Sequence, residues 1–322
     1  MNMQYTTISR SRESGFTLVE VMIAMLLSVV LLGGVVQIAS STKASYRSNE
    51  AVAQLQENGR FATEILARDI RMADFWGCAN NVGLVTNTLN PGAGSIDFAD
   101  GGVNGTEGGG APDTLVLRGG FDSGIQVEAP FGPLPSADIK VTPGNGLNQD
   151  DIVLISDCTS ADIMQVTNAN PSTAGNIVHN SGAGSPGNST KILSKVYTGD
   201  ATVYRAQQLN YNIAVGSSGQ PALFRNGQEL VDGIEDLQIL YGEDIDPPET
   251  AGSGAANYYV PADQVTDMNN VVSIRFALVA RSYGNNVANG QTYSVLGTSV
   301  TSADNRLRQV YTSTIGIRNR LN

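Results

Sequence analysis

The chain has 322 residues, of which 41% are apolar and 15% are charged, so it can bury a core and is not a disordered protein. Its formal net charge of −11 argues against nucleic-acid binding by the chain as a whole, and its single histidine argues against most metal chemistry. The 36 glycines and the low aromatic content of 6% favour a β-rich extracytoplasmic body with long loops over a compact cytosolic enzyme.

The first predicted element is an apolar helix over Phe16 to Ala39. This run contains one charged residue and is long enough to cross a hydrocarbon layer of about 30 Å. A cleaved secretory signal peptide is one alternative, but its apolar region is normally about 7 to 15 residues and ends in a better cleavage site than the one at Ala39. A plain single-pass anchor, oriented by Arg10 and Arg12 on the cytoplasmic side, is the other.

Neither alternative explains Glu20, which lies inside the apolar run. An acidic side chain at the centre of a spanning helix costs roughly 2.5 to 3.5 kcal/mol, and less near an interface, so such residues normally have a partner and a function. If the chain is cut after Gly15, Phe16 acquires a free amino group. The amino group of an adjacent subunit could then pair with the Glu20 carboxylate, which predicts assembly through this helix.

The order SGFTLVEVMI, from Ser14 to Ile23, resembles the class III signal of type IV prepilins and type II secretion pseudopilins. The resemblance implies that an aspartyl prepilin peptidase removes residues 1–15 on the cytoplasmic side, cutting after Gly15, and methylates Phe16. It also implies that Glu20 guides packing of residues 16–39, the transmembrane helix, into a filament. Two features fit less well: Glu13 is an acid in a leader that is usually basic, and the pair Gly33-Gly34 predicts a bend or a melted stretch.

Residues 40–76 are predicted to continue the helix to about Met72 as an amphipathic segment. Apolar or small residues recur there at steps of three and four, while charged residues lie on the other faces. A separate helix after a loop is the alternative and would leave the same function. The apolar positions are Val52, Leu55, Gly59, Ala62, Leu66, Ile70 and Ala73.

The two cysteines, Cys78 and Cys158, are too far apart in sequence for a CxxC redox motif or a zinc site of closely spaced cysteines. In an oxidising compartment we expect one structural disulfide, with two separate buried thiols as the alternative. Such a bond would close a loop of about 80 residues and stabilise the fold by roughly 4 kcal/mol on the loop-entropy model.

Residues 77–322 are predicted to form a β-rich head, which with the helix gives an α+β fold. Asn226-Gly227 predicts a type I′ hairpin turn, and the Gly/Asn/Ser-rich stretches Asn87 to Pro112 and Asn168 to Thr190 predict loops. The predicted strands are short β-branched runs: Thr114 to Leu117, Ile152 to Ile155, Ala201 to Tyr204, Tyr211 to Val215, Ala222 to Phe224, Glu229 to Val231, Leu237 to Tyr241, Val271 to Val279 and Tyr311 to Ile317.

The sequence contains no recognisable motif of catalytic residues. His179 has no paired acids nearby and is expected to be a solvent-exposed loop histidine rather than a base or a ligand. Asn188-Ser189-Thr190 fits the weak pattern of a glycan acceptor. We therefore predict that the protein is not an enzyme and needs no cofactor.

Two charged stretches could bind ions or nucleic acid. Asp244 and Asp246 alternate as calcium ligands do, and Glu249 follows three residues later. The continuation of an EF-type loop is missing and two prolines occupy its place, so a solvated turn is preferred to a metal site. The weaker group Asp97, Asp100 and Asn104 has the same two interpretations. The C-terminal arginines, Arg306, Arg308, Arg318 and Arg320, are the only candidate basic patch, and ordinary solvated strand faces are preferred to a nucleic-acid site.

The head narrows the resemblance to the PilW-type minor pilins, relatives of the J pseudopilin, over most of the chain. The segments that carry it are RDIRMADFWGC, VYRAQQLNYNIAV, PALFRNGQELVDGIEDLQILYG, VVSIRFALVARS and VYTSTIGIRNR. The resemblance implies a structural subunit that is held in the bacterial inner membrane with its head in the periplasm. There it joins other minor pilins to initiate the pilus and then lies at the filament tip.

The partners implied are the major pilin, the prepilin peptidase, the inner-membrane assembly platform and a tip adhesin. A type II secretion pseudopilin is one alternative function. A membrane-tethered periplasmic binding protein or hydrolase, which predicts no cut after Gly15, is another.

Overall fold

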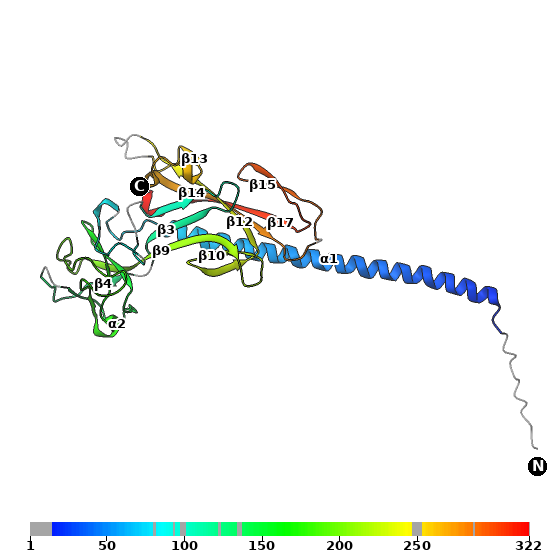
Figure 1. Cartoon of the computed structure of the whole chain (residues 1–322), viewed down its shortest axis with the longest axis horizontal. Coiled ribbons are helices and arrows are strands. Elements are labelled where there is room, and N and C mark those ends of the chain that lie inside the picture. Colours follow the sequence, from blue (N-terminus) through cyan, green and yellow to red (C-terminus); the bar gives the residue numbers. More distant parts are fainter. Residues whose placement is uncertain are drawn as a thin grey trace, which may run out of the picture. The chain divides into compact units, whose positions relative to one another are not determined.

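The computed structural model describes residues 15–79, 82–92, 94–96, 101–121, 124–133, 137–246, 253–285 and 287–321. The chain divides into two compact units, Met1–Glu50 and Ala51–Asn322. The described part of the first unit is helical from Leu18 onwards. The second unit, the head, combines a helical segment with β-sheets (Figure 1). The predicted α+β class is therefore confirmed.

Helix α1, Leu18–Met72, is the predicted N-terminal helix. Within the described residues it is the one helix long and apolar enough to span a membrane. The expected interruption at Gly33-Gly34 is wrong, because the helix continues through both glycines and through the polar stretch after Ala39. Each glycine costs about 1 kcal/mol relative to alanine, which the long helical runs on either side tolerate because elongation is far easier than nucleation.

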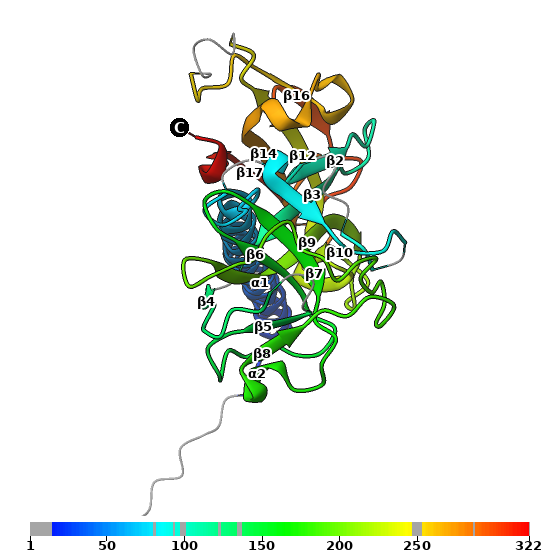
Figure 2. The same ribbon diagram turned by 90° about the vertical axis from the view of Figure 1, so that its left-hand side faces the viewer.

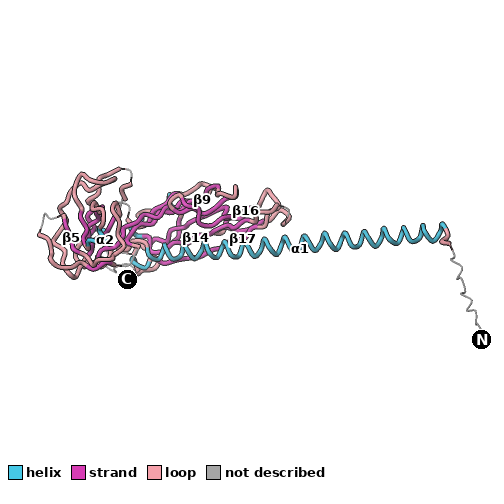
Figure 3. The backbone as a smooth tube through the Cα atoms, turned by 90° about the horizontal axis from the view of Figure 1, so that it is seen from below, coloured by secondary structure: helices cyan, strands magenta, loops and turns pink. Residues whose placement is uncertain are grey.

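Within the head, the last turns of α1 pack against strands, as the amphipathic pattern predicts. Leu55, Ala62, Leu66 and Ile70 are buried on the packed face and belong to the largest apolar core of the head. In Figures 1 and 3 this segment lies beside β14 and β17.

Among its described residues, the head contains two main sheets and two small ones. The larger sheet has the path β1-β7-β6-β9-β10-β11, with β2-β3 and β4 attached to β9, and the second has the order β13-β12-β14-β17. The strands are β1 Val85–Asn87, β2 Val103–Thr106, β3 Thr114–Gly120, β4 Ile125–Gln126, β5 Asp138–Lys140, β6 Ile152–Ser156, β7 Ala161–Gln165, β8 Asn176–Val178, β9 Thr202–Val215, β10 Pro221–Arg225, β11 Gln228–Asp232, β12 Ile234–Glu243, β13 Tyr258–Val260, β14 Val271–Arg281, β15 Thr292–Val295, β16 Thr298–Thr301 and β17 Arg308–Gly316.

Every strand predicted from the sequence is present, and the two runs beginning at Ala201 and Tyr211 form one long strand, β9. The predicted hairpin is confirmed, since Asn226 and Gly227 both have positive φ and connect the antiparallel pair β10 and β11. The prediction of loops for Asn87 to Pro112 and Asn168 to Thr190 is partly wrong. The first stretch contains β2, and the second contains helix α2, Pro171–Ala174, and strand β8.

Beyond the core on α1, a second lobe of the head has its own apolar core. Val141, Val153, Met164, Ile177 and Val203 belong to it. Figure 2 shows β5, β8 and α2 together in this lobe. Strand β9 joins the two cores, because its first part pairs with β6 and its later part pairs with β3 and β10.

Candidate functional site

The start of α1 places Glu20 in a reciprocal cap with Thr17. The Thr17 backbone N–H and side-chain hydroxyl each donate to Glu20 Oε2 at 2.9 Å, and the Glu20 backbone N–H donates to Thr17 Oγ1 at 3.3 Å. This is the capping-box arrangement, in which the third residue of a helix bonds back to the residue that caps it. The carboxylate therefore lies at the helix N-terminus, directly after Gly15 and Phe16, where the helix dipole also favours a negative charge.

The surface of α1 around this cap is apolar and exposed. Phe16 is 86% exposed, and the exposed apolar residues are Phe16, Leu18, Val19, Val21, Met22, Ile23, Met25, Leu26, Leu27, Val29, Val30, Leu31, Leu32, Val35, Val36 and Ile38. A helix that is apolar all round is stable only in a membrane or against other helices. The arrangement can thus insert into lipid and present one carboxylate to a neighbouring helix.

Replacing Thr17 with valine is expected to loosen the first turn of α1 by about 1 kcal/mol, because valine keeps the branched shape and loses the capping hydroxyl. Hydrogen exchange of the amides of residues 18–20, measured in lipid nanodiscs, should become faster in the variant. Thr17→Ser, which keeps the hydroxyl, is the matched control and should behave as the unmodified chain does. Equal protection in the valine variant would contradict a capping role for Thr17.

In the head, Asp69 fixes α1 to the larger sheet. This carboxylate is buried and accepts hydrogen bonds from the Tyr211 hydroxyl at 2.5 Å and from Arg225 Nη1 at 2.8 Å. Burial and the neighbouring carboxylate raise the pKa of Tyr211 well above its ordinary value, so the phenol stays a donor. A second contact is close packing at Gly59, where an added Cβ would lie 2.0 Å from the ring of Tyr311, whose hydroxyl donates to the Leu55 carbonyl at 2.9 Å.

The predicted disulfide is present between Cys78 and Cys158, whose Cα atoms are 4.4 Å apart. It joins the segment after α1 to the turn between β6 and β7. Nearby, Asp74 accepts hydrogen bonds from Trp76 Nε1 at 2.8 Å and from the Gly102 backbone at 2.9 Å, and it forms an ion pair with Arg320. The end of the helix is therefore tied covalently and ionically to both parts of the head.

The C-terminal arginines do not form an open basic patch. Arg308 pairs with Glu235 at 2.5 Å and with Asp304 at 2.5 Å, and Arg320 pairs with Asp74. Arg306 also lies 3.5 Å from Asp304, while Arg318 is exposed. Acidic partners thus neutralise most of this cluster. The expectation of solvated strand faces is wrong for Arg308 and Arg320, whose side chains are largely buried in these ion pairs, and Arg318 and Arg320 lie in a short 3-10 helix rather than in a strand.

The acidic loop after β12 uses its carboxylates to organise its own backbone. Asp244 accepts hydrogen bonds from the Asp246 and Gly254 backbone N–H groups at 3.1 and 2.8 Å, and Asp246 accepts one from Asn257 Nδ2 at 3.1 Å. The described residues include no group of three or more His, Cys, Asp or Glu side chains that could hold a metal ion. Glu249 lies outside the described residues, as do Asp97 and Asp100 of the weaker group.

The expectation that His179 is solvent-exposed is wrong. Its side chain is fully buried, its Nε2 lies 3.2 Å from the Lys191 carbonyl oxygen, and its Nδ1 has no partner. Burial lowers the pKa of His179 to about 4, so the ring is neutral in the fold. The glycan acceptor pattern is also not available, because Asn188 is buried and its side-chain amide bonds the backbone of Gln165.

The buried His179 predicts a loss of stability on acidification. Its folded-state pKa of about 4 lies below the ordinary 6.5, so its stabilising contribution is complete above pH 6.5 and is lost as the pH falls toward 4. At 1.36 kcal/mol per pKa unit the loss approaches about 3 kcal/mol. We expect the difference in free energy of unfolding between the unmodified chain and His179→Phe, measured by chemical denaturation, to change by about this amount between pH 6.5 and 4, with the unmodified chain losing stability relative to the variant.

The comparison with the variant is needed because the fold raises the pKa of Asp113, so this residue has the opposite effect on stability when the pH falls. Burial raises the pKa of Asp113 from 3.8 to about 6, although its carboxylate accepts hydrogen bonds from the Gly108 and Ile239 backbones. Its protonation therefore favours the folded state as the pH falls from about 6 to 3.8. An unchanged slope in His179→Phe would exclude the histidine as the source of acid sensitivity.

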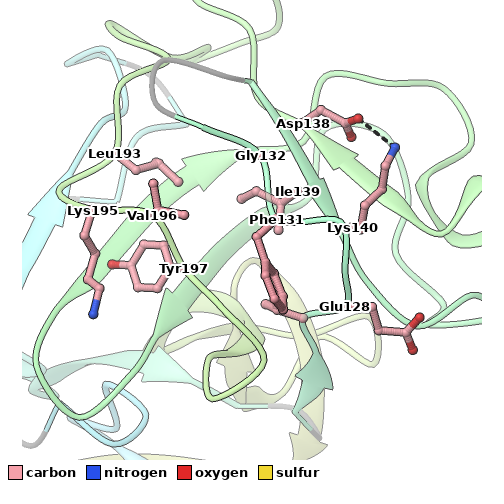
Figure 4. Close-up of a pocket in the computed structure, with 11 residues that line it drawn as sticks. Glu128, Phe131, Gly132, Asp138, Ile139, Lys140, Leu193, Lys195, Val196 and Tyr197 are labelled. Carbon is pink, nitrogen blue, oxygen red and sulfur yellow. Dashed lines mark hydrogen bonds and ion pairs between the residues drawn. The ribbon is translucent and has the colours of Figure 1, made fainter.

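A shallow hollow in the second lobe is lined mainly by apolar side chains, among them Phe131, Leu193 and Val196. Figure 4 shows Lys140 at its rim paired with Asp138, at 2.7 Å. Its internal space of about 20 Å³ is little more than room for one water molecule. This hollow is too small to enclose a substrate.

Two parts of the chain are similar to known pilus proteins. The family model described as Type IV Pilus-assembly protein W matches residues 194–319, and that of the prokaryotic N-terminal methylation motif matches residues 10–36. The chain is 35% identical over 83 residues to a pilin-like protein, PilA3, of Thermus thermophilus, a match that covers 25% of this chain and 36% of the relative. No solved structure matches the chain significantly.

Proposed function

Because this chain is a type IV pilin-like protein with a PilW domain behind an N-terminal methylation motif, we propose that it is a minor pilin. It is a structural, non-catalytic subunit that joins other minor pilins to initiate assembly of the pilus and remains at the filament tip. The observation that carries this proposal is the combination of the PilW match in the head with the exposed apolar helix capped by Glu20.

The proposed mechanism begins in the inner membrane, with the exposed apolar first part of α1 spanning the bilayer and the head in the periplasm. Removal of residues 1–15 by the prepilin peptidase would leave the amino group of Phe16 next to the capping residue Thr17. The Glu20 carboxylate, held at the helix start by Thr17, would then meet the amino group of a neighbouring pilin. In a low-dielectric environment such a pair attracts more strongly than it does in water.

Processing is expected between Gly15 and Phe16, with the mature chain beginning at methylated Phe16. The amino-terminal peptide of the membrane-extracted protein, identified by mass spectrometry, checks this. A peptidase-deficient strain is the control and should contain the unprocessed chain. A mature chain that begins at Met1 or near Ser41 would rule out the proposed processing.

The assembly role itself is tested by purifying sheared filament tips and identifying the attached proteins. We expect this subunit together with other minor pilins, the major pilin and a tip adhesin, and we expect a deletion strain to retain the assembly platform but to lose most surface pili. Uniform distribution of the subunit along the filament would contradict the tip location.

The alternatives predict different outcomes in the same strains. A type II secretion pseudopilin would leave pilus number unchanged and reduce protein secretion when deleted. A membrane-tethered periplasmic binding protein or hydrolase would keep residues 1–15 and would be absent from filaments.

A further inference from the structure

Five asparagines of this chain precede glycine: Asn58, Asn104, Asn145, Asn226 and Asn289. In this dipeptide the glycine backbone nitrogen can attack the asparagine amide carbon, because glycine has no Cβ to hinder ring closure. The reaction requires that the side chain and the next peptide group are free to rotate. We infer that Asn289 is a site of spontaneous deamidation, and that the fold protects the other four.

Two of the protected asparagines lie in turns and are held through their side chains. Asn226 donates from Nδ2 to the Gln208 carbonyl at 2.9 Å and accepts at Oδ1 from the Asn210 N–H at 2.7 Å. Asn145 donates from Nδ2 to the Thr142 carbonyl at 2.9 Å. Rotation toward ring closure would break these bonds.

The other two protected asparagines lie in regular structure. Asn58 is inside α1 and donates from Nδ2 to the Asp232 carbonyl at 2.8 Å. Asn104 is in β2, paired with β3, and Gly105 after it is so closely packed that a Cβ there would lie 2.0 Å from Tyr241 Oη. In both places the backbone is fixed by the ladder or helix to which it belongs.

Within the described part of the chain, Asn289 has neither the side-chain hydrogen bonds nor the regular secondary structure that hold the other four asparagines. Its side chain is exposed, and neither it nor Gly290 makes a hydrogen bond or ion pair with the part of the chain that the structure describes. The nearest atom to a Cβ built on Gly290 is the Ser302 carbonyl oxygen, at 4.0 Å. The peptide group after Asn289 is therefore free to turn onto its side chain.

The chemistry needs water alone as a co-reactant. The Gly290 nitrogen loses its proton and bonds to Asn289 Cγ, the Cγ–Nδ2 bond breaks, and ammonia leaves a succinimide ring. Addition of one water opens the ring at Cγ to give aspartate, or at the main-chain carbonyl carbon to give isoaspartate. Both products add one negative charge, and isoaspartate also adds one atom to the main chain.

The added main-chain atom of isoaspartate would affect the structure, because the residues on both sides of Asn289 are held by hydrogen bonds. The Ala288 N–H donates to the Asn305 carbonyl at 2.9 Å, and the Gln291 N–H donates to Ser302 Oγ at 2.9 Å. The Gln291 side chain also bonds both backbone groups of Arg308, at 2.9 and 2.8 Å, which holds the β15–β16 hairpin beside β17. A longer main chain between these two fixed points loosens the hold of Gln291 on β17.

The test is ageing of the purified full-length mature protein in detergent at neutral pH and physiological temperature, followed by peptide mapping with mass spectrometry. We expect Asn289 to convert at least about tenfold faster than each of the other four, the ratio that corresponds to about 1.4 kcal/mol of additional barrier. Isoaspartate should be identified by electron-transfer fragmentation, and hydrogen exchange of residues 291–301 should be faster in the aged protein.

Gly290→Ala is the matched control, because the space for its methyl group is open and the added side chain slows ring closure. This variant should age without modification at Asn289 and without the change in hydrogen exchange. First conversion at any of the other four asparagines, or an Asn289 that converts no faster than they do, would overturn the inference.

Discussion

Glu20→Ala is expected to insert into the membrane and to be cut after Gly15, but to fail to enter the initiating complex, so that surface pili fall to near zero when this subunit is the only one of its type. The substitution removes a charge from an apolar helix, which makes insertion easier by up to about 2.5 to 3.5 kcal/mol and by less near the interface. What is lost is the attraction between this carboxylate and the amino group of a neighbouring subunit.

The geometry of the cap makes Glu20→Gln the informative partner variant. Glutamine keeps an oxygen that can accept the Thr17 N–H and hydroxyl bonds but carries no charge. If charge pairing drives assembly, both variants lose pili, whereas only Glu20→Ala should show a frayed first turn by hydrogen exchange.

Three quantities are scored for each variant: the amount in the membrane, the fraction processed and the number of surface pili. Normal pili in Glu20→Gln with loss in Glu20→Ala would assign Glu20 a capping role alone. If both variants form pili in normal numbers, Glu20 is an acidic residue that the membrane interface tolerates and that assembly does not need. The assembly role proposed for Glu20 would then be wrong.

Asp69→Ala is expected to destabilise the head by about 3 to 5 kcal/mol, because it leaves the buried hydroxyl of Tyr211 and the guanidinium of Arg225 without their acceptor. The value should lie toward the lower end, because the Arg225 side chain is 31% exposed and water can replace part of the lost bond. The measurement is chemical denaturation of the full chain in detergent, followed by tryptophan fluorescence of the buried Trp76.

Tyr211→Phe and the double variant complete a cycle that isolates the carboxylate–phenol bond from the rest of the cluster. A coupling free energy close to zero would show that Asp69 acts through packing alone. Asp69→Asn is the isosteric control and should lose less stability than the alanine variant, since it retains an acceptor for Tyr211.

The sequence was most informative where structure follows from local pattern. The extent of α1, its buried face at Leu55, Leu66 and Ile70, and the turn at Asn226-Gly227 all depend on neighbours a few residues apart, so periodicity and turn preference suffice to predict them. Glu20 stood out for the same reason, as one charge in an apolar run.

Strand β7 was missed because its sequence, ADIMQ, has one β-branched residue, and the strands were predicted from β-branched runs. His179 was misplaced for a related reason. It lies within the Gly/Asn/Ser-rich stretch Asn168 to Thr190, which predicts an exposed loop, but in the fold its side chain is buried and one ring nitrogen has no partner.

By itself, the sequence determined the apolar helix, the processing motif and the strands with strong β-branched patterns, because each of these depends on residues close together in the sequence. The disulfide could be proposed from two cysteines, but only the fold places Cys78 beside Cys158. Only the tertiary structure decided that Asp69 meets Tyr211, which is 142 residues away. Such contacts depend on how separate elements pack, and no local pattern records which buried polar groups will face each other.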